Sequence, residues 1–289
     1  KSPGNYSGRL GLPIALGRLQ PDQRVAVLEM ACDSPGEMAD LVRIAAPRHG
    51  VVLNVSRAHL ESLGSLEGVA AEKGRLVECL PPDGCAVLNS DDALVAAMAD
   101  RTLARVLRIG LSPAAEVRAV DVEAEEAGLS FTVTAGGGRR RVRCGLLGKH
   151  NVYAALAAVA MGLIYGLGLD EVAQALEGMQ PLAGRLRPLR GRGGSLVLDD
   201  TYSSIPAGVA AALDALAGLR RRPAIVVLGD MAELGQEEEQ AHREAGRRTA
   251  SVADLLVTCG ERMRLAAAEA KRCGLPAERV RVTYTAEDA

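Results

Sequence analysis

The chain has 289 residues, more than one domain usually contains, and this length predicts two compact units that each bury a core. Acidic and basic residues nearly cancel, 36 against 34, which argues against a surface built for nucleic acid or anionic lipid and favours a small-molecule partner. Six cysteines show no CxxC pair or zinc-type spacing and fit a reducing cytoplasm; they are Cys32, Cys79, Cys85, Cys144, Cys259 and Cys273.

Short β-branched runs alternate with helical stretches in the first 90 residues and predict an α/β fold with a parallel sheet. The runs are VAVLE (25–29), VVLNV (51–55) and CAVLN (85–89). Ligands gather where the strands of such a sheet end at their carboxyl side. The polar residues that close the runs are therefore candidate site residues, although turn formation is a fair alternative for the third run: they are Glu29, Asn54, Asn89, Asp91 and Asp92.

The pattern changes to alternation between about residues 116 and 146, with Ala-Gly and Gly-Gly-Gly breaks. This predicts antiparallel hairpins inserted into the first domain. Helices are expected after His150 and from about Asp170.

Two features bear on membranes and export. The stretch 152–169 carries no charge over 18 residues, close to the roughly 20 apolar residues that a membrane span needs. Ala and Gly dominate it, and Gly166 and Gly168 interrupt it, which favours a helix packed inside a soluble protein. The start, KSPGNYSGRLG, has no apolar run after a charged segment and predicts no secretion signal.

A domain boundary is predicted near residue 180, where Pro, Gly and Arg replace the apolar periodicity. The predicted domains are residues 1–180 and 181–289. Beyond the boundary, SLVLDD, AIVVLGD and DLLVTCG predict three strands, with helices at about 206–219 and 236–251 between them. The second domain is therefore expected to be Rossmann-like.

No glycine-rich phosphate loop is present. The Gly148-Lys149 pair has Arg143 where the first loop glycine would stand and His150 where a magnesium-binding Ser or Thr would stand, so it is no Walker A motif. Taken alone, this argues against a nucleotide-binding enzyme.

Several separated motifs nevertheless point to one family. The first domain contains KSPGNYSGRLGLPIALGRL, VAVLEMACDSPGEM, NVSRAHLESLGSLEGVAAEKGRL and GKHNVYAALAA. The second contains AGRLRPL, LVLDDTYSSIP and VVLGDMAELGQEEEQAH. In this order they resemble the motifs of the Mur ligase family, and the GDMAELG segment is most similar to the MurF type.

This resemblance implies a central ATP-binding domain with a mostly parallel sheet and a hairpin insertion, followed by an incomplete Rossmann-like C-terminal domain. It implies a cytoplasmic ligase of peptidoglycan synthesis that uses ATP and Mg²⁺. ATP would phosphorylate the carboxylate of UDP-N-acetylmuramoyl-tripeptide, and the amine of D-alanyl-D-alanine would attack the acyl phosphate. Such a transfer needs cations that stabilise the developing negative charge. The full-length protein is expected to be a monomer.

The same resemblance assigns a metal and catalytic set. Glu29 would be a magnesium ligand, His59 would help to hold a second magnesium, and Lys73 would be a lysine that CO₂ converts to a carbamate facing the metal. The competing readings are a solvated glutamate, a loop histidine and a surface lysine.

A nucleotide and substrate set is implied as well. Asn151 would contact adenine, and Arg185 would contact ATP phosphate. Asp200, with Asp199 beside it, would bind the ribose hydroxyls. Asn5 would lie on the substrate side of the cleft. A helix N-cap, a surface arginine and a simple turn compete for Asn151, Arg185 and Asn5. The motif residues Asp230, Glu233 and His242 have no assigned role.

The chain also departs from the family pattern. Amide side chains of the family are replaced at Ser7, Gly8, Ala154, Ser203 and Ile205, which removes hydrogen-bonding groups. The family's UDP-sugar domain, its phosphate loop and its final strands are missing from the sequence. We therefore expect little or no ligase activity from this polypeptide alone, and we expect an unpaired sheet edge that favours self-association.

Two alternatives stay open. One is another ligase of the same superfamily, such as a different Mur ligase, folylpolyglutamate synthase or cyanophycin synthetase. The other is a non-catalytic paralogue that keeps the fold and binds a partner or ligand.

Overall fold

The computed structural model describes residues 5–219 and 221–288. The chain packs as two compact units, residues 1–118 and 119–289. This division follows packing and does not test the family-domain boundary predicted near residue 180, which stays a prediction.

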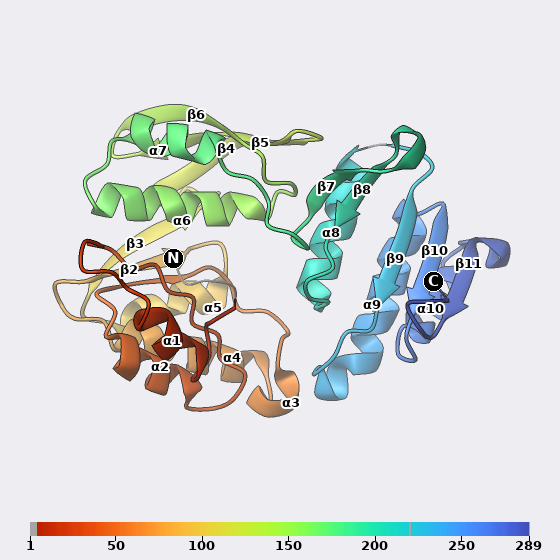
Figure 1. Ribbon diagram of the computed structural model, residues 1–289, viewed down its shortest axis with the longest axis horizontal. Helices are drawn as coiled ribbons and strands as arrows, with labels where there is room; N and C mark the ends of the chain where they lie inside the picture. The colour runs from red at the N-terminus through yellow and green to blue at the C-terminus, as the bar shows by residue number, and fades with distance from the viewer. Residues whose placement is uncertain (1–4, 220, 289) are drawn as a thin grey trace. The chain divides into compact units, whose positions relative to one another are not determined.

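Unit 1 is built on parallel strands (Figure 1). β1 pairs with β2 and β2 with β3, and the short contact of β3 with the start of β4 is also parallel. All five residues of β2 are buried, as expected for a strand covered on both faces. The strands are β1 (His49–Val52), β2 (Cys85–Asn89) and β3 (Arg105–Gly110), and β4 (Val117–Glu125) begins in unit 1 and continues into unit 2.

The helices of unit 1 bury apolar side chains against this sheet. The side chain of Ser65 accepts a hydrogen bond from Gly68 N and so starts the helix α4, and the Asp92 carboxylate caps α5 in the same way. α4 packs beside α2. The helices are α1 (Gly11–Leu16), α2 (Glu37–Ala45), α3 (Leu60–Leu63), α4 (Leu66–Glu78), α5 (Ala93–Ala96) and the 3₁₀ helix η1 (Ala97–Arg101).

One predicted strand is wrong. Residues 25–29 form no strand, and Val25 and Val27 are 47% and 65% exposed. A β-branched run has strand propensity, but a strand forms only beside a neighbour that takes up its main-chain hydrogen bonds. Within residues 5–219 and 221–288 no strand pairs with this segment.

Unit 2 begins with the predicted hairpin and its helices. β5 (Gly128–Ala135) and β6 (Gly138–Cys144) are antiparallel, and β4, β5 and β6 complete the sheet order β1-β2-β3-β4-β5-β6. α6 (Asn151–Ile164) and α7 (Leu169–Glu177) follow. In the described part of the chain, no helix has the length and apolar character that crossing a membrane requires.

The remainder of unit 2 contains two small sheets. β7 (Arg187–Arg190) and β8 (Leu196–Asp199) are antiparallel, whereas β9 (Ile225–Gly229), β10 (Leu255–Cys259) and β11 (Val280–Thr283) pair in parallel in the order β11-β10-β9. Three α-helices and three 3₁₀ segments complete it among the described residues: α8 (Pro206–Leu219), α9 (Glu238–Val252), α10 (Arg264–Arg272), η2 (Arg192–Gly194), η3 (Gly235–Glu237) and η4 (Ala277–Arg279). The strands and helices predicted here are confirmed, and β11 and α10 were not anticipated.

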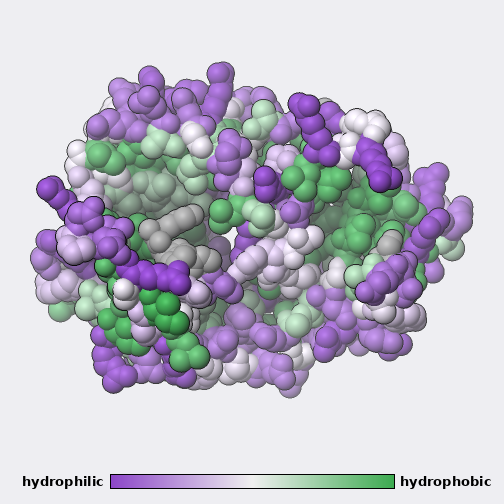
Figure 2. Space-filling view, viewed as in Figure 1, coloured by the Kyte–Doolittle hydropathy of each residue, from purple (hydrophilic) through white to green (hydrophobic). Residues whose placement is uncertain are grey.

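The three-stranded sheet is covered on one face. Val226 and Leu256 are buried in one apolar cluster with side chains of α8, α9 and α10. On the opposite face of β9, Ile225 and Val227 are 57% and 62% exposed. Figure 2 shows hydrophobic surface over the region of β9 and β10.

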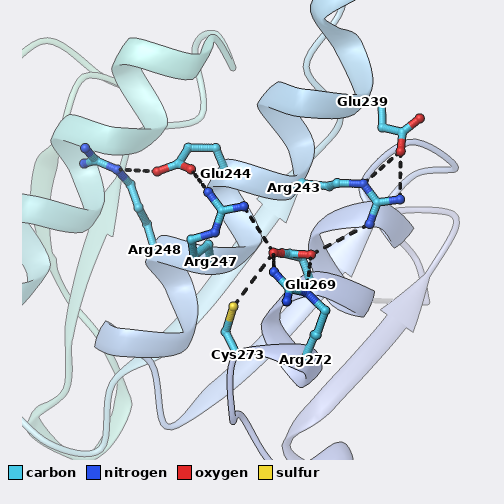
Figure 3. A network of polar contacts seen from close by, with 8 residues as sticks. All are labelled: Glu239, Arg243, Glu244, Arg247, Arg248, Glu269, Arg272 and Cys273. Atoms are coloured by element: carbon cyan, nitrogen blue, oxygen red, sulfur yellow. Dashed lines mark hydrogen bonds and ion pairs between the residues drawn. The ribbon is translucent and has the colours of Figure 1, made fainter.

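A charged network joins α9 to α10 (Figure 3). The Glu269 side chain is 3% exposed and accepts from Arg272 Nη2 at 2.5 Å and from Arg247 Nη2 at 3.2 Å, while Arg243 Nη1 lies 3.7 Å away. The guanidinium groups of Arg272, first, and of Arg247 lower the pKa of Glu269 to about 2 against the opposing effect of burial.

Candidate functional site

Lys73 is a half-buried amine in unit 1 rather than a plain surface lysine. It lies on α4, and its Nζ donates a 2.8 Å hydrogen bond to the main-chain oxygen of Asn54, two residues beyond the end of β1. Burial lowers the pKa of the Lys73 amine, and Cys32 and Asp92 act in the opposite direction. An amine held in a single direction and partly desolvated is a candidate for chemistry.

Glu29 and His59 belong to segments that contact the surroundings of Lys73. Met30, next to Glu29, packs in one apolar cluster with Leu76 of α4. His59 precedes α3 in a left-handed conformation, φ +55°, a backbone position that costs energy outside glycine and that often marks functional sites. The Ser62 hydroxyl, from α3, donates to the main-chain oxygen of Asp33.

The structure therefore brings the three segments together but does not test the metal set. Among the described residues no group of three or more His, Cys, Asp or Glu side chains is arranged to hold a metal ion. The Lys73 amine, as it stands, is a hydrogen-bond donor and not a ligand. The assignment of Glu29, His59 and Lys73 stays a proposal.

Glu72 is not among the site residues predicted from the sequence. Its carboxylate is 7% exposed and accepts from Gly36 N at 2.9 Å and Met38 N at 2.7 Å, at the N-terminus of α2. A glutamate on α4 thus serves as the cap of another helix, 34 and 36 residues away in sequence. Because the partner is so distant, local capping patterns could not reveal it.

In unit 2, Asn151 starts α6 and its side chain is engaged locally. Asn151 Nδ2 donates to the main-chain oxygen of Leu147 at 2.6 Å and lies 3.2 Å from His150 Nε2. The N-cap of α6 is His150, so the alternative reading of Asn151 as N-cap is wrong. Its amide oxygen remains the group suited to a donor on a ligand.

The predicted ribose and phosphate residues lie around one turn of unit 2. Asp199 Oδ2 accepts from Gly184 N at 3.1 Å and Asp200 Oδ1 accepts from Leu186 N at 3.0 Å. Arg185 lies between these two main-chain groups, and its guanidinium stacks over the ring of Tyr202 at 3.9 Å. Arg185 is thus a stacked, oriented arginine, a state that the sequence alone could not separate from a free surface side chain.

Asn5 lies in a turn. Its main-chain oxygen accepts from both the amide and the hydroxyl of Ser7, and the preceding residues of the KSPGNY motif, 1–4, lie outside the described residues. Ser7 is 6% exposed and faces the interior.

The GDMAELG and His242 motif has a structural explanation within unit 2. Asp230 Oδ1 accepts from Met263 N at 2.7 Å and Oδ2 from Arg262 N at 3.3 Å, which fixes the turn before α10. His242 is fully buried; its Nε2 accepts from Met231 N at 3.1 Å, so the proton sits on Nδ1, 2.7 Å from the Glu238 oxygen. Asp230 and His242 therefore both stabilise the loop after β9.

Comparison with known proteins gives matches along most of the chain. The Mur ligase middle domain model matches residues 1–162, and the Mur ligase glutamate ligase domain model matches residues 184–289. The UDP-N-acetylmuramoyl-tripeptide–D-alanyl-D-alanine ligase of Mycobacterium tuberculosis strain H37Rv is 39% identical over 252 residues, covering 85% of this chain and 49% of the relative. The enzyme of the same name from Escherichia coli K12 is 34% identical, covering 84% and 54%.

A solved structure agrees with these sequence matches. The crystal structure of MurF from Acinetobacter baumannii superimposes with a TM-score of 0.90 at 28% identity and covers 100% of this chain and 62% of that one. The chain spans about half the length of the curated relatives that it matches.

Proposed function

Because the chain belongs to the Mur ligase family, we propose that the protein carrying it is an ATP-dependent ligase that joins D-alanyl-D-alanine to UDP-N-acetylmuramoyl-tripeptide in peptidoglycan synthesis. The 39% identity to a relative with that name supports this choice over the other ligases of the superfamily. The ligase works on soluble reactants through an acyl phosphate, whose formation needs bound ATP and charge-stabilising groups.

The observation that carries the proposal is the half-buried amine of Lys73. Lysine occupies only positions 1, 73, 149 and 271, and arginine supplies the rest of the 34 basic residues. An arginine could hold a charge at position 73, but a guanidinium does not add CO₂. A carbamate on Nζ would keep one N–H for the Asn54 oxygen and supply oxygen atoms to a cation.

Magnesium fits this part of unit 1 in its chemistry. Glu29 offers a carboxylate, the ligand type that Mg²⁺ prefers, and His59 an imidazole; Lys73 would fit only as the carbamate. Bound magnesium would neutralise charge on the transferred phosphoryl group. The chain's own contribution is the hydrogen bond that directs the Lys73 amine to the Asn54 oxygen and the Ser62 hydroxyl that ties α3 to Asp33.

In unit 2 we propose that Asn151 contacts a purine, Arg185 a phosphate, and Asp200 with Asp199 the ribose hydroxyls. The stacking of Arg185 on Tyr202 supports this role, since it orients the guanidinium fork that matches phosphate oxygens. Asn5 would lie on the substrate side of unit 1.

Phosphate release that depends on both UDP-N-acetylmuramoyl-tripeptide and D-alanyl-D-alanine, measured on the full-length protein, tests the proposal. Lys73→Ala and Glu29→Ala should each lower the rate by at least about a hundredfold, the scale of losing one electrostatic group in a transition state. Lys271→Ala, a lysine on α10, is the matched control and should leave the rate unchanged. Substrate-dependent turnover that survives Lys73→Ala would overturn the assignment of this residue.

A non-catalytic binding protein is the second candidate. The serine and isoleucine at Ser203 and Ile205, in place of family amides, favour it because lost hydrogen-bonding groups weaken ligand binding. Tight binding of Mg-ATP without any substrate-dependent phosphate release would support this reading.

A further inference from the structure

Three side chains hold three consecutive residues of the main chain at the exit of β1. Asn89 Nδ2 donates to the oxygen of Leu53, Lys73 Nζ to the oxygen of Asn54, and Asp92 Oδ2 accepts from the amide of Val55, each at 2.8 Å. We call these three contacts the exit clamp. All of them lie within unit 1.

The exit clamp is built from a rigid base. Asn89 ends the fully buried strand β2 and is itself 5% exposed. Asp92 is fixed by its other oxygen, which accepts from Leu94 N and Val95 N at the start of α5. Because both side chains are immobilised by their own elements, they can impose a position on the segment that they hold.

The segment that they hold lies outside the strands and helices of unit 1. Residues 53–59 form neither strand nor helix, and Asn54 is exposed. The segment runs from β1 to His59, which starts α3 in its left-handed conformation. The course of the chain from β1 to His59 therefore starts from the exit clamp.

We propose that Asn89 and Asp92 are positioning residues that, together with the Lys73 amine, set the conformation of residues 53–59 and hence the place of His59. The link to catalysis rests on the proposed function, whereas the clamp itself does not. Since the central contact is made by Lys73, a chemical change at that amine acts on the same segment that carries His59.

Two near-isosteric variants break one contact each. Asp92→Asn keeps an oxygen that can cap α5, but its NH₂ group then faces Val55 N and cannot accept a hydrogen bond. Asn89→Asp removes the donor to the Leu53 oxygen. Asp91→Asn is the matched control, because Asp91 holds Leu111 N and Ser112 N instead.

Hydrogen exchange of the 289-residue chain at single-amide resolution is the first measurement, made without nucleotide or metal. Asp92→Asn should speed exchange of the Val55 amide about tenfold or more, the loss of one hydrogen bond to a charged group. In both clamp variants the NMR ring signals of His59 should shift or broaden, whereas Asp91→Asn should leave them in place. Circular dichroism identifies a variant that fails to fold. If one clamp variant fails, the other clamp variant alone tests the exit clamp.

The second measurement reports on Lys73. Acetylation by a small acylating reagent, followed by mass spectrometry of the four lysines, should show faster modification at Lys73 in Asn89→Asp, with Lys149 and Lys271 unchanged. Val55 exchange within twofold of the wild type together with unmoved His59 signals would overturn the exit clamp. Loss of the clamp signals with no effect on substrate-dependent turnover of the full-length protein would instead count against the proposed function of His59 and Lys73.

Discussion

The guanidinium of Arg101 fills the space that a side chain at Gly74 would need. A Cβ built on Gly74 would overlap Nη1 and Cζ of Arg101. Through this gap Arg101 donates to the main-chain oxygens of Ala70 at 3.3 Å and Ala71 at 3.2 Å. The glycine after Lys73 thus exposes the backbone of α4 to an arginine from η1, which fixes the helix that carries the lysine.

Gly74→Ala should therefore destabilise the protein, although alanine is intrinsically the better helix former by about 1 kcal/mol. We expect a net loss of up to about 2 kcal/mol in chemical denaturation followed by circular dichroism, because Arg101 must give up its hydrogen bonds to Ala70 and Ala71. Gly218→Ala, in α8, is the control: nothing lies within 4 Å of its Cβ position, so alanine should be neutral or slightly stabilising there. An equal increase in stability for both variants would show that the Arg101 side chain moves aside without loss.

Elements with a local sequence signal could be predicted, whereas elements that depend on a distant partner could not. The alternating run after residue 116 and the helices beyond His150 and at 206–219 could be predicted because their periodicity is local. The run at 25–29 has the same local signal and forms no strand, because pairing depends on a neighbour elsewhere in the chain.

In the candidate site, too, residue types could be predicted from motifs, whereas contacts with distant residues could not. Motifs could suggest Lys73, but not that its amine reaches the Asn54 oxygen, and nothing local indicates that Glu72 caps α2. Asp230 and His242 appeared as motif residues without a role, and their partners, at Met263 and Met231, became visible only in the folded chain.

His242→Ala should destabilise the fold without removing any group that we assign to ATP or substrate. The variant leaves the buried Met231 amide without its acceptor, a cost of about 1–3 kcal/mol. The loss should appear as a lower denaturation midpoint and as faster hydrogen exchange at Met231. His49→Ala, a histidine in unit 1, should not change the Met231 amide. Unchanged exchange at Met231 in His242→Ala would contradict the structural role.

The Glu269 network predicts a loss of stability in acid. The folded-state pKa of Glu269 is about 2, below its usual value of 4.5, so the carboxylate stabilises the folded chain above pH 4.5 and this contribution disappears as pH falls toward 2. Glu269→Gln should lower stability near neutral pH and should flatten its dependence between pH 5 and about 2. Glu239→Gln, whose carboxylate is 66% exposed and pairs with Arg243, is the control. Parallel stability curves for Glu269→Gln and the wild type would count against the network.

The uncovered face of β9 predicts self-association of the 289-residue chain. β9 is the edge strand of its sheet among residues 5–219 and 221–288. On its uncovered face, Ile225 and Val227 expose apolar β-branched side chains without an intervening charge. Edges of this kind pair with other chains, and an inserted lysine blocks such pairing. Val227→Lys should therefore reduce the concentration-dependent increase in sedimentation coefficient. Leu103→Lys, which replaces an 86% exposed leucine in unit 1, tests whether added charge alone has this effect. If the wild-type chain sediments as a monomer at every concentration, the edge of β9 is not an association site.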